Sequence, residues 1–111
     1  MKSRVDLVTK ALDLMGVSQL GQNAEPEDTD IVDAEVDGLL ADLALRKIVY
    51  VADSNQLEDE WLSPIATILA SRCSPTFYIP RDRDAEQAEE MRLRQLTRSP
   101  IAHETMRSDY F

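Results

Sequence analysis

The longest apolar stretch of the chain runs over residues 60–77, and between Glu60 and Arg81 its only charged residue is Arg72. Within it, apolar side chains recur at steps of three and four, which is the spacing of one helix face. These positions are Ile65, Ile68, Leu69 and Cys73. Because charges are nearly absent from every side, we expect this helix to be covered on most sides. It is the predicted central helix of a small bundle.

Two starts are compatible with the sequence of this helix. The Ser-Pro pair at 63–64 suits an N-cap and first helical position, since proline lacks only an N–H that would be unbonded there. A start one turn earlier, capped by Asp59 or Glu58, costs a hydrogen bond at the proline. We expect the helix to end at Pro75, because a residue before proline is pushed out of the α region, here Ser74.

A first helix is predicted over residues 3–15. Ser3 and Asp6 have the spacing of a capping box, and Gly16 is placed to close the helix in a left-handed conformation. The main apolar face comprises Val5, Val8, Leu12 and Met15. Residues 17–25 have no helical period and are predicted to be a loop.

A second helix begins at Pro26 and reaches Arg46 and Lys47 in its last turn. Its apolar seam steps by four, three and four: Val32, Val36, Leu39 and Leu43. Gly38 in the interior costs about 1 kcal/mol relative to Ala, which suggests a close helix crossing there. Residues 47–52 are rich in β-branched and aromatic side chains, so they form either a short strand or an extended link.

After the central helix, residues 76–80 are predicted to be extended, and a fourth helix capped by Asp82 or Asp84 runs to about Thr97. Its apolar positions are Ala85, Ala88, Met91 and Leu96, and it carries the spaced pairs Glu89/Arg92 and Glu90/Arg94. Residues 98–111 contain Pro100 and show no apolar period. We therefore expect a helical domain over 1–97 and an extended C-terminal tail over 98–111.

These elements define the expected fold class, an all-α protein built as a small four-helix bundle with an extended C-terminal tail. The core prediction is specific: one face of the central helix is buried against the first and second helices. It places Ile65, Ile68, Leu69 and Cys73 against Val8, Leu12, Leu39 and Leu43.

The charge of the chain is unevenly distributed. Its formal net charge is −9 over 111 residues, and residues 21–60 hold 12 acids but only 2 bases. Such a surface repels nucleic acid. There is no apolar run long enough to span a bilayer and no pattern of a signal peptide, so we expect no membrane association. A single cysteine excludes an internal disulfide and fits a reducing cytoplasm at synthesis.

The sequence offers little for catalysis or for a cofactor. His103, the only histidine, falls in the predicted tail, while Cys73 lies on the apolar face of the central helix. No zinc spacing, phosphate loop, dinucleotide motif or calcium loop is present. Arg72 has two readings: it snorkels to the surface, or it pairs with an acid of the second helix or of a neighbouring subunit. We expect no enzyme activity, metal or cofactor.

Two stretches resemble a known family when taken in order. They are 6–17, DLVTKALDLMGV, and 69–77, LASRCSPTF, with Glu25-Pro26 opening the helix between them. Together they are similar to the head-completion adaptors of tailed bacteriophages, in particular to the tail accessory factor beneath the portal of short-tailed phages. The resemblance covers roughly residues 3–97, and this chain is shorter than some members, which carry a longer C-terminal extension.

The resemblance implies a structural virion protein at the head–tail junction, made in the host bacterial cytoplasm. Copies of the chain form a ring, usually twelvefold, that extends the DNA channel. One side of the ring holds the portal protein, the other receives the next tail or nozzle protein, and DNA passes without specific binding.

Two groups of residues are assigned on this basis. The tail residues are expected to bind the portal through apolar and aromatic anchors: Ile101, Met106, Arg107, Tyr110 and Phe111. A second group is expected at a subunit interface or in the channel: Asp28, Asp30, Asp33, Asp37 and Arg72. The competing hypothesis is an acidic inhibitor that mimics DNA and binds a nucleic-acid-binding protein. A small enzyme is the weakest reading, because no nucleophile and base can be assembled.

Overall fold

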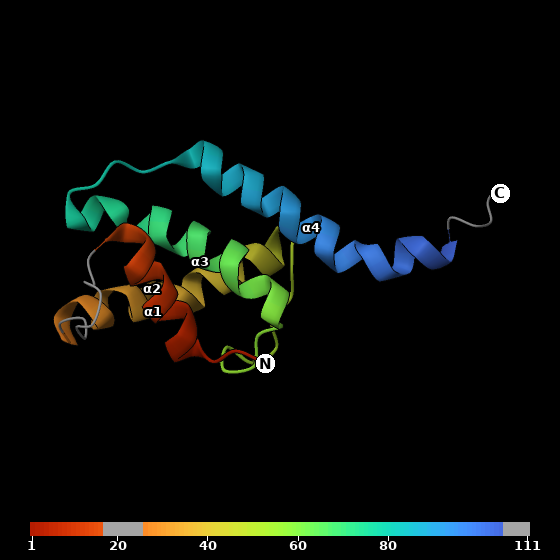
Figure 1. Cartoon of the computed structure of the whole chain (residues 1–111), viewed down its shortest axis with the longest axis horizontal. Helices are drawn as coiled ribbons and strands as arrows, with labels where there is room; N and C mark the ends of the chain where they lie inside the picture. Colours follow the sequence, from red (N-terminus) through yellow and green to blue (C-terminus); the bar gives the residue numbers. More distant parts are fainter. Residues whose placement is uncertain (17–25, 106–111) are drawn as a thin grey trace.

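Helices form nearly all of the regular structure in the computed structural model of the chain, which describes residues 1–16 and 26–105, with side chains to Thr97. In order they are α1 (Arg4–Met15), α2 (Pro26–Leu45), α3 (Asp59–Cys73), the 3-10 helix η1 (Ser74–Phe77) and α4 (Arg83–Thr105). α3 lies between the others and contacts α1, α2 and α4 (Figure 1). The described residues contain no strand, only one antiparallel bridge between Lys2 and Leu57. The prediction of an all-α bundle is confirmed.

The core lies where α3 meets α1 and α2, as predicted. Ile65, Ile68 and Leu69 are fully buried and Cys73 is 1% exposed. They belong to one buried cluster that also contains Val8, Leu12, Leu39 and Leu43. Burying each such side chain contributes about 1.5–3 kcal/mol relative to leaving it in water. The packing of α1 and α2 on α3 therefore makes a large contribution to stability.

α3 begins at the earlier of the two predicted starts. Its N-cap is Glu58, whose side chain makes no capping hydrogen bond, and Pro64 lies inside the helix. Proline there removes one backbone hydrogen bond. The side chain of Pro64 is nevertheless fully buried, so packing offsets the lost bond.

The end of α3 differs in detail from the prediction. The α-helix ends at Cys73, but Ser74 keeps helical angles (φ −51°, ψ −44°) and its hydroxyl donates to the Ala70 carbonyl at 2.7 Å. The chain then turns through η1, because the fixed φ of Pro75 is compatible with a 3-10 helix. The predicted extended segment is therefore wrong as far as Phe77. Tyr78, at φ +63°, ends the turn.

α1 and α2 begin as predicted, and the predicted seam of α2 is buried. The predicted face of α1 is only partly right: Val8 and Leu12 are buried together with Leu7 and Ala11, whereas Val5 is 71% exposed. Ser3 and Asp6 form both halves of the capping box, and Gly16 closes α1 at φ +74°. α2 starts at Pro26 but ends at Leu45, two residues earlier than expected. The predicted close crossing at Gly38 is wrong, because a Cβ added there meets no atom within 4 Å.

The link after α2 is extended rather than a strand. Lys47 has φ +59°, which turns the chain out of the helix, and its amide donates to the Ala44 carbonyl at 3.0 Å. Ile48 and Val49 then enter the core at 2% and 4% exposure. Burial of these two side chains explains why β-branched residues occur in this link although it forms no strand.

α4 has the predicted cap but a different buried face. The Asp82 carboxylate accepts from the Ala85 amide at 3.0 Å, which selects the first of the two candidate caps. The face turned to the body carries Leu93, fully buried, and Glu86, 4% exposed, whereas Met91 is 64% exposed. The predicted apolar face of α4 is wrong because the carboxylate of Glu86 lies on the side that faces the body. A hydrophobic pattern counts such a residue as polar and assigns it to the outside.

The predicted end of α4 and start of an extended tail are also wrong. The helix continues past Thr97 to Thr105, so residues 98–105 are helical and Pro100 lies inside α4. A proline removes one hydrogen bond and often kinks a helix, but it does not force the chain to leave it. Figure 1 shows this last part of α4 projecting beyond the body. No described helix is long and apolar enough to cross a membrane.

Candidate functional site

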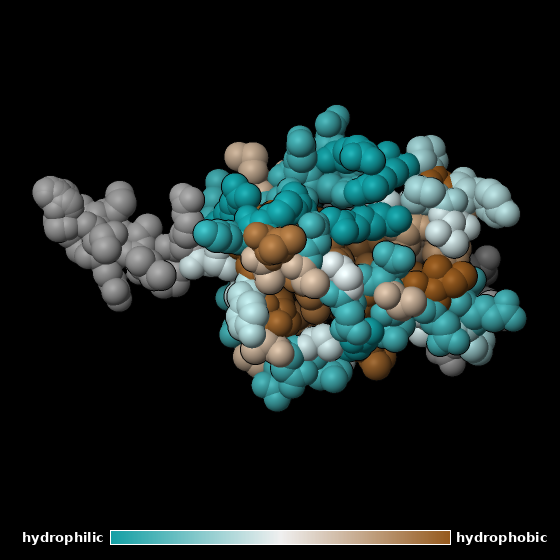
Figure 2. All heavy atoms as spheres, turned by 180° about the vertical axis from the view of Figure 1, so that it is seen from behind, coloured by the Kyte–Doolittle hydropathy of each residue, from teal (hydrophilic) through white to brown (hydrophobic). Residues whose placement is uncertain are grey.

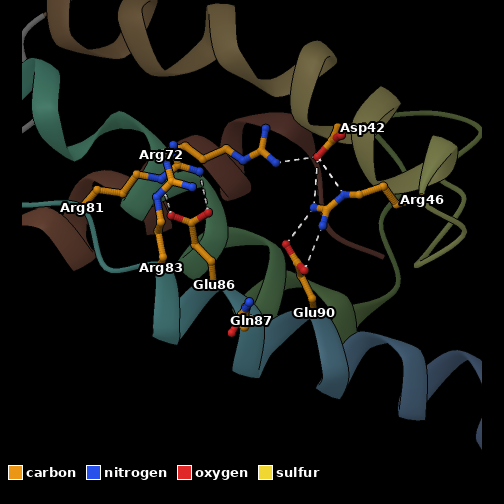
Figure 3. A pocket seen from close by; sticks show the side chains of 8 residues that line it. All are labelled: Asp42, Arg46, Arg72, Arg81, Arg83, Glu86, Gln87 and Glu90. Atoms are coloured by element: carbon orange, nitrogen blue, oxygen red, sulfur yellow. Dashed lines mark hydrogen bonds and ion pairs between the residues drawn. The ribbon is translucent and has the colours of Figure 1, made fainter.

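Charged side chains from three helices converge in one pocket of about 320 Å³ (Figure 3). The end of α2, the last turn of α3 and the start of α4 supply its walls. The lining residues are Asp42, Arg46, Arg72, Arg81, Arg83, Glu86, Gln87 and Glu90. Four of the chain's 12 basic residues thus lie with only three of its 21 acids. We call this site the arginine pocket.

Arg46 holds one side of the arginine pocket. Its guanidinium donates two hydrogen bonds to Glu90, at 3.0 and 2.7 Å, and one to Asp42 at 3.2 Å. The bond to Glu90 raises the pKa of Arg46. Glu90 therefore does not make the predicted pair with Arg94. It ties α4 to the end of α2 instead, while Glu89 and Arg92 do approach to 3.9 Å.

Arg72 completes a bridge between α3 and α2. Its Nη2 donates to Asp42 at 2.5 Å, and this bond is the main cause that lowers the pKa of Asp42. Of the two readings of Arg72, the structure thus bears out the ion pair, and the partner is an acid of the second helix. Its Nε is buried and has no hydrogen-bond partner among the described residues. An unpaired buried donor of this kind costs about 1–3 kcal/mol.

Glu86 is the buried carboxylate of the site, and the sequence did not single it out. It accepts from Arg81 at 2.7 and 2.8 Å and from the Ser71 hydroxyl at 2.6 Å. The hydrogen bonds from Arg81, followed by that from Ser71, hold the pKa of Glu86 below its usual range, although burial opposes this. No pattern in the sequence marks it, because an acid in the first turn of a helix is ordinary.

Arg83 is an exposed arginine that lines the arginine pocket. Within the described part of the chain it makes no ion pair, and Figure 3 shows its side chain directed toward Arg81 and Glu86. Glu86 already receives three hydrogen bonds from other groups. The pocket lining thus holds four arginines and three acids, on a protein with a net charge of −9, although Asp82 and Asp84 flank Arg83 in the adjoining pocket.

The five residues predicted for an interface or channel do not gather in one place. Arg72 lies in the arginine pocket. Asp33 and Asp37 bind Arg4 of α1, with the closest pairs at 2.6 and 2.7 Å, and the hydrogen bond that Arg4 donates to Asp33 is the main cause that raises the pKa of Arg4. Asp28 and Asp30 lie in the first turns of α2 and make no ion pair among the described residues.

The predicted portal-binding residues fall largely outside the description. Ile101 lies in α4 instead of an extended tail, and its side chain is not described. Met106, Arg107, Tyr110 and Phe111 lie beyond the described residues, so their proposed role stays a prediction.

On the face seen in Figure 2, apolar surface forms separate patches. Seen from behind, the body is mostly hydrophilic, with apolar side chains in a hollow and in smaller areas (Figure 2). A second pocket, of about 460 Å³, is lined by Ala44, Lys47, Ile48, Val49, Tyr50, Trp61 and Thr97. It lies at the link after α2, beside the point where the described side chains of α4 end.

Cysteine, histidine and acidic side chains most often mark catalysis or metal binding, and those among the described residues form no such site. Burial raises the pKa of the Cys73 thiol to about 11, which keeps it protonated and unreactive at neutral pH. The residues searched, 1–16 and 26–97, hold no group of three acids, histidines or cysteines arranged to bind a metal.

Comparison with protein-family models, with curated proteins and with solved structures found no match to this chain.

Proposed function

We propose that this chain is the head-to-tail adaptor of a tailed bacteriophage, a structural virion protein that forms a ring beneath the portal. In this role the ring extends the DNA channel and connects the capsid to the next tail or nozzle protein. The resemblance of residues 6–17 and 69–77 to head-completion adaptors provides the class. The chain acts as a connector and carries out no chemistry.

The observation that carries the proposal is the shape of α4. This helix has 23 residues, which is about 35 Å at 1.5 Å per residue, and its first part packs on α3. The remainder projects beyond a body whose other dimensions are 27 and 25 Å (Figure 1). A projecting helix gives a small protein a second point of contact away from its core, which a connector between two larger assemblies requires.

The acidic surface of α2 is consistent with a channel wall as well. Asp28 and Asp30 make no ion pair within the described residues. Negative charge on a channel wall keeps DNA from adhering as it passes. Asp33 and Asp37 contribute less to such a field, because Arg4 neutralises part of their charge.

The second candidate function is a DNA mimic that blocks a nucleic-acid-binding protein, and it rests on the net charge of −9. The two functions predict different partners in a pull-down from infected lysate. An adaptor recovers the portal protein, and the captured complex tolerates salt because aromatic anchors contribute to it. A mimic recovers a basic host protein, and that complex dissociates steeply as salt rises.

Two truncations test the role of the C-terminal segment. Removing residues 98–111 leaves the buried contacts of Glu86 and Leu93 in place, so the shortened chain should remain helical and folded. Removing only residues 106–111 also deletes Tyr110 and Phe111, the predicted anchors. We expect both truncated proteins to lose portal binding in the pull-down. Undiminished binding by the chain that ends at Thr97 would refute the anchoring role.

A further inference from the structure

The acidic start of α2 and the arginine pocket at its other end lie too far apart to neutralise each other. Between Lys10 and Arg46 the sequence contains no base, so only Arg4 reaches the acids of this helix from α1. Asp28 and Asp30 at its start remain unpaired among the described residues. The rise along α2 from Asp28 to Asp42, at the edge of the arginine pocket, is about 21 Å.

The arginine pocket has donors that its own acids do not satisfy. The Arg83 side chain makes no hydrogen bond or ion pair within the described residues, so its guanidinium donors are available to an incoming group. Asp42 is shared between Arg46 and Arg72, and the Glu86 carboxylate is fully engaged by Arg81 and Ser71. An added carboxylate in this pocket would accept charge-assisted hydrogen bonds, which are about twice as strong as neutral ones.

We propose that the arginine pocket of one copy receives the acidic start of α2 from a second copy of the chain, with the exposed Asp30 as the acid that enters it. Asp28, two residues earlier, points to another side of the helix and adds to the negative charge of this end. The occupant is identified by charge complementarity: the unpaired acids and the unpaired guanidinium donors belong to the same molecule and cannot meet within it. Arg83, exposed on the lining of the pocket, makes the first contact, and an Asp side chain is short enough to enter a pocket of about 320 Å³.

Each copy therefore offers one acidic end and one basic pocket, so association continues from copy to copy. Contacts that join two different surfaces produce closed rings or open filaments. The inference deepens the proposed adaptor function and rests on it for the closed ring. It assigns the contact between neighbouring subunits to particular residues.

Complementary variants test this contact by sedimentation velocity. We expect the unmodified chain to exceed twice the mass of a 12.5 kDa monomer at about 0.1 M salt and to dissociate at about 1 M, where the Debye length falls from ~10 to ~3 Å. Arg83→Glu alone and the double change Asp28→Lys with Asp30→Lys alone should each be monomeric. Mixed in equal amounts, they should associate again, because each supplies the surface that the other lacks.

Matched controls keep loss of folding from imitating the result. Arg94→Glu changes an exposed arginine on α4 outside the pocket, and Asp13→Lys changes an exposed acid at the end of α1. Both should associate as the unmodified chain does, and circular dichroism should show unchanged helicity for every variant. A monomeric unmodified chain, association that stops at a dimer, or a mixture that stays monomeric overturns the inference.

The inference and the proposed function can fail separately. Charge-dependent association without any portal binding leaves the contact standing and removes the adaptor role. A ring on the portal that forms equally well with Arg83→Glu supports the adaptor role and overturns the contact.

Discussion

At the scale of single residues, Glu86 decides how α4 sits on the body. Its carboxylate is buried, and it joins Arg81 to Ser71 of α3 at distances of 2.6–2.8 Å. The Ser71 hydroxyl also lies 3.0 Å from the backbone of Asp82, at the cap of the helix. One polar cluster therefore fixes both the start and the rotation of α4, which apolar contacts at Leu93 alone would leave loose.

The lowered pKa of Glu86 predicts a pH dependence of stability. Because the folded pKa lies below the unfolded value of about 4.5, the ionised form stabilises the folded protein at neutral pH. This contribution is fully present above the unfolded pKa and disappears as pH falls through the folded pKa. Urea unfolding at pH 7 and pH 3 should show that Glu86→Gln costs about 1–3 kcal/mol at pH 7 and much less at pH 3.

The control for that experiment is Glu35→Gln, the same change at an exposed position in the middle of α2 that makes no ion pair among the described residues. We expect it to alter stability by less than about 0.5 kcal/mol. An equal effect of both substitutions at pH 7 would mean that the cluster around Glu86 does not hold α4.

Substitution by alanine should have opposite effects on stability at Gly38 and at Gly16. Gly38→Ala should stabilise the protein by about 0.5–1 kcal/mol, since the position is helical and open on its outer side. Gly16→Ala should destabilise it, because φ +74° is a backbone conformation that residues with a side chain rarely adopt. Thermal unfolding of the two variants checks this, and a destabilised Gly38→Ala would show that the surface at Gly38 is covered.

At the scale of elements, α3 is the helix on which the others depend. It contacts α1, α2 and α4, and eight of its 15 residues are buried. A helix in this position makes the three others cooperative, since each buries its seam against the same partner.

Leu69→Ala tests this central position. Leu69 is fully buried, and removing most of its side chain should cost about 2–5 kcal/mol of unfolding free energy. Met91→Ala, at a residue that is 64% exposed, is the matched control and should change it by less than about 0.5 kcal/mol. An unchanged melting temperature for Leu69→Ala would show that α3 is not the centre of the fold.

The buried face of a helix was predictable from the sequence where apolar side chains form it. It was not predictable where a charged side chain positions the helix. Val32, Val36 and Leu39 repeat at helical spacing, so the buried face of α2 follows from hydrophobicity alone. The face of α4 depends on Glu86, whose burial requires partners far away in the sequence. A pattern of polar and apolar letters has no means of distinguishing such a carboxylate from a solvated one.

The same reason explains which parts of the arginine pocket were missed. Arg72 was noticed because it is the only charge in an apolar stretch. Arg46, Arg81 and Arg83 lie in segments with many charges, and they meet only because α2, α3 and α4 converge. The end of α4 was missed for a local reason, since Pro100 indicated a stop although a helix can continue through a proline.

At the scale of the whole molecule, charge and shape are both polarised. Acids dominate the start of α2. Arginines gather where α2, α3 and α4 meet (Figure 3), and α4 projects from the body (Figure 1). A molecule with distinct surfaces at separate places has the features needed to contact several neighbours in an assembly. This arrangement is the physical basis of the proposed adaptor role.

Electron microscopy of the chain mixed with the portal protein of the same virion tests that role most directly. We predict one added ring beneath the portal, with the copies arranged around the channel in the usual twelvefold symmetry and α4 directed toward the portal. Omitting residues 98–111 should abolish the ring while the portal itself remains intact. Portal particles without added density, at concentrations where the chain is folded and in excess, would contradict the adaptor assignment.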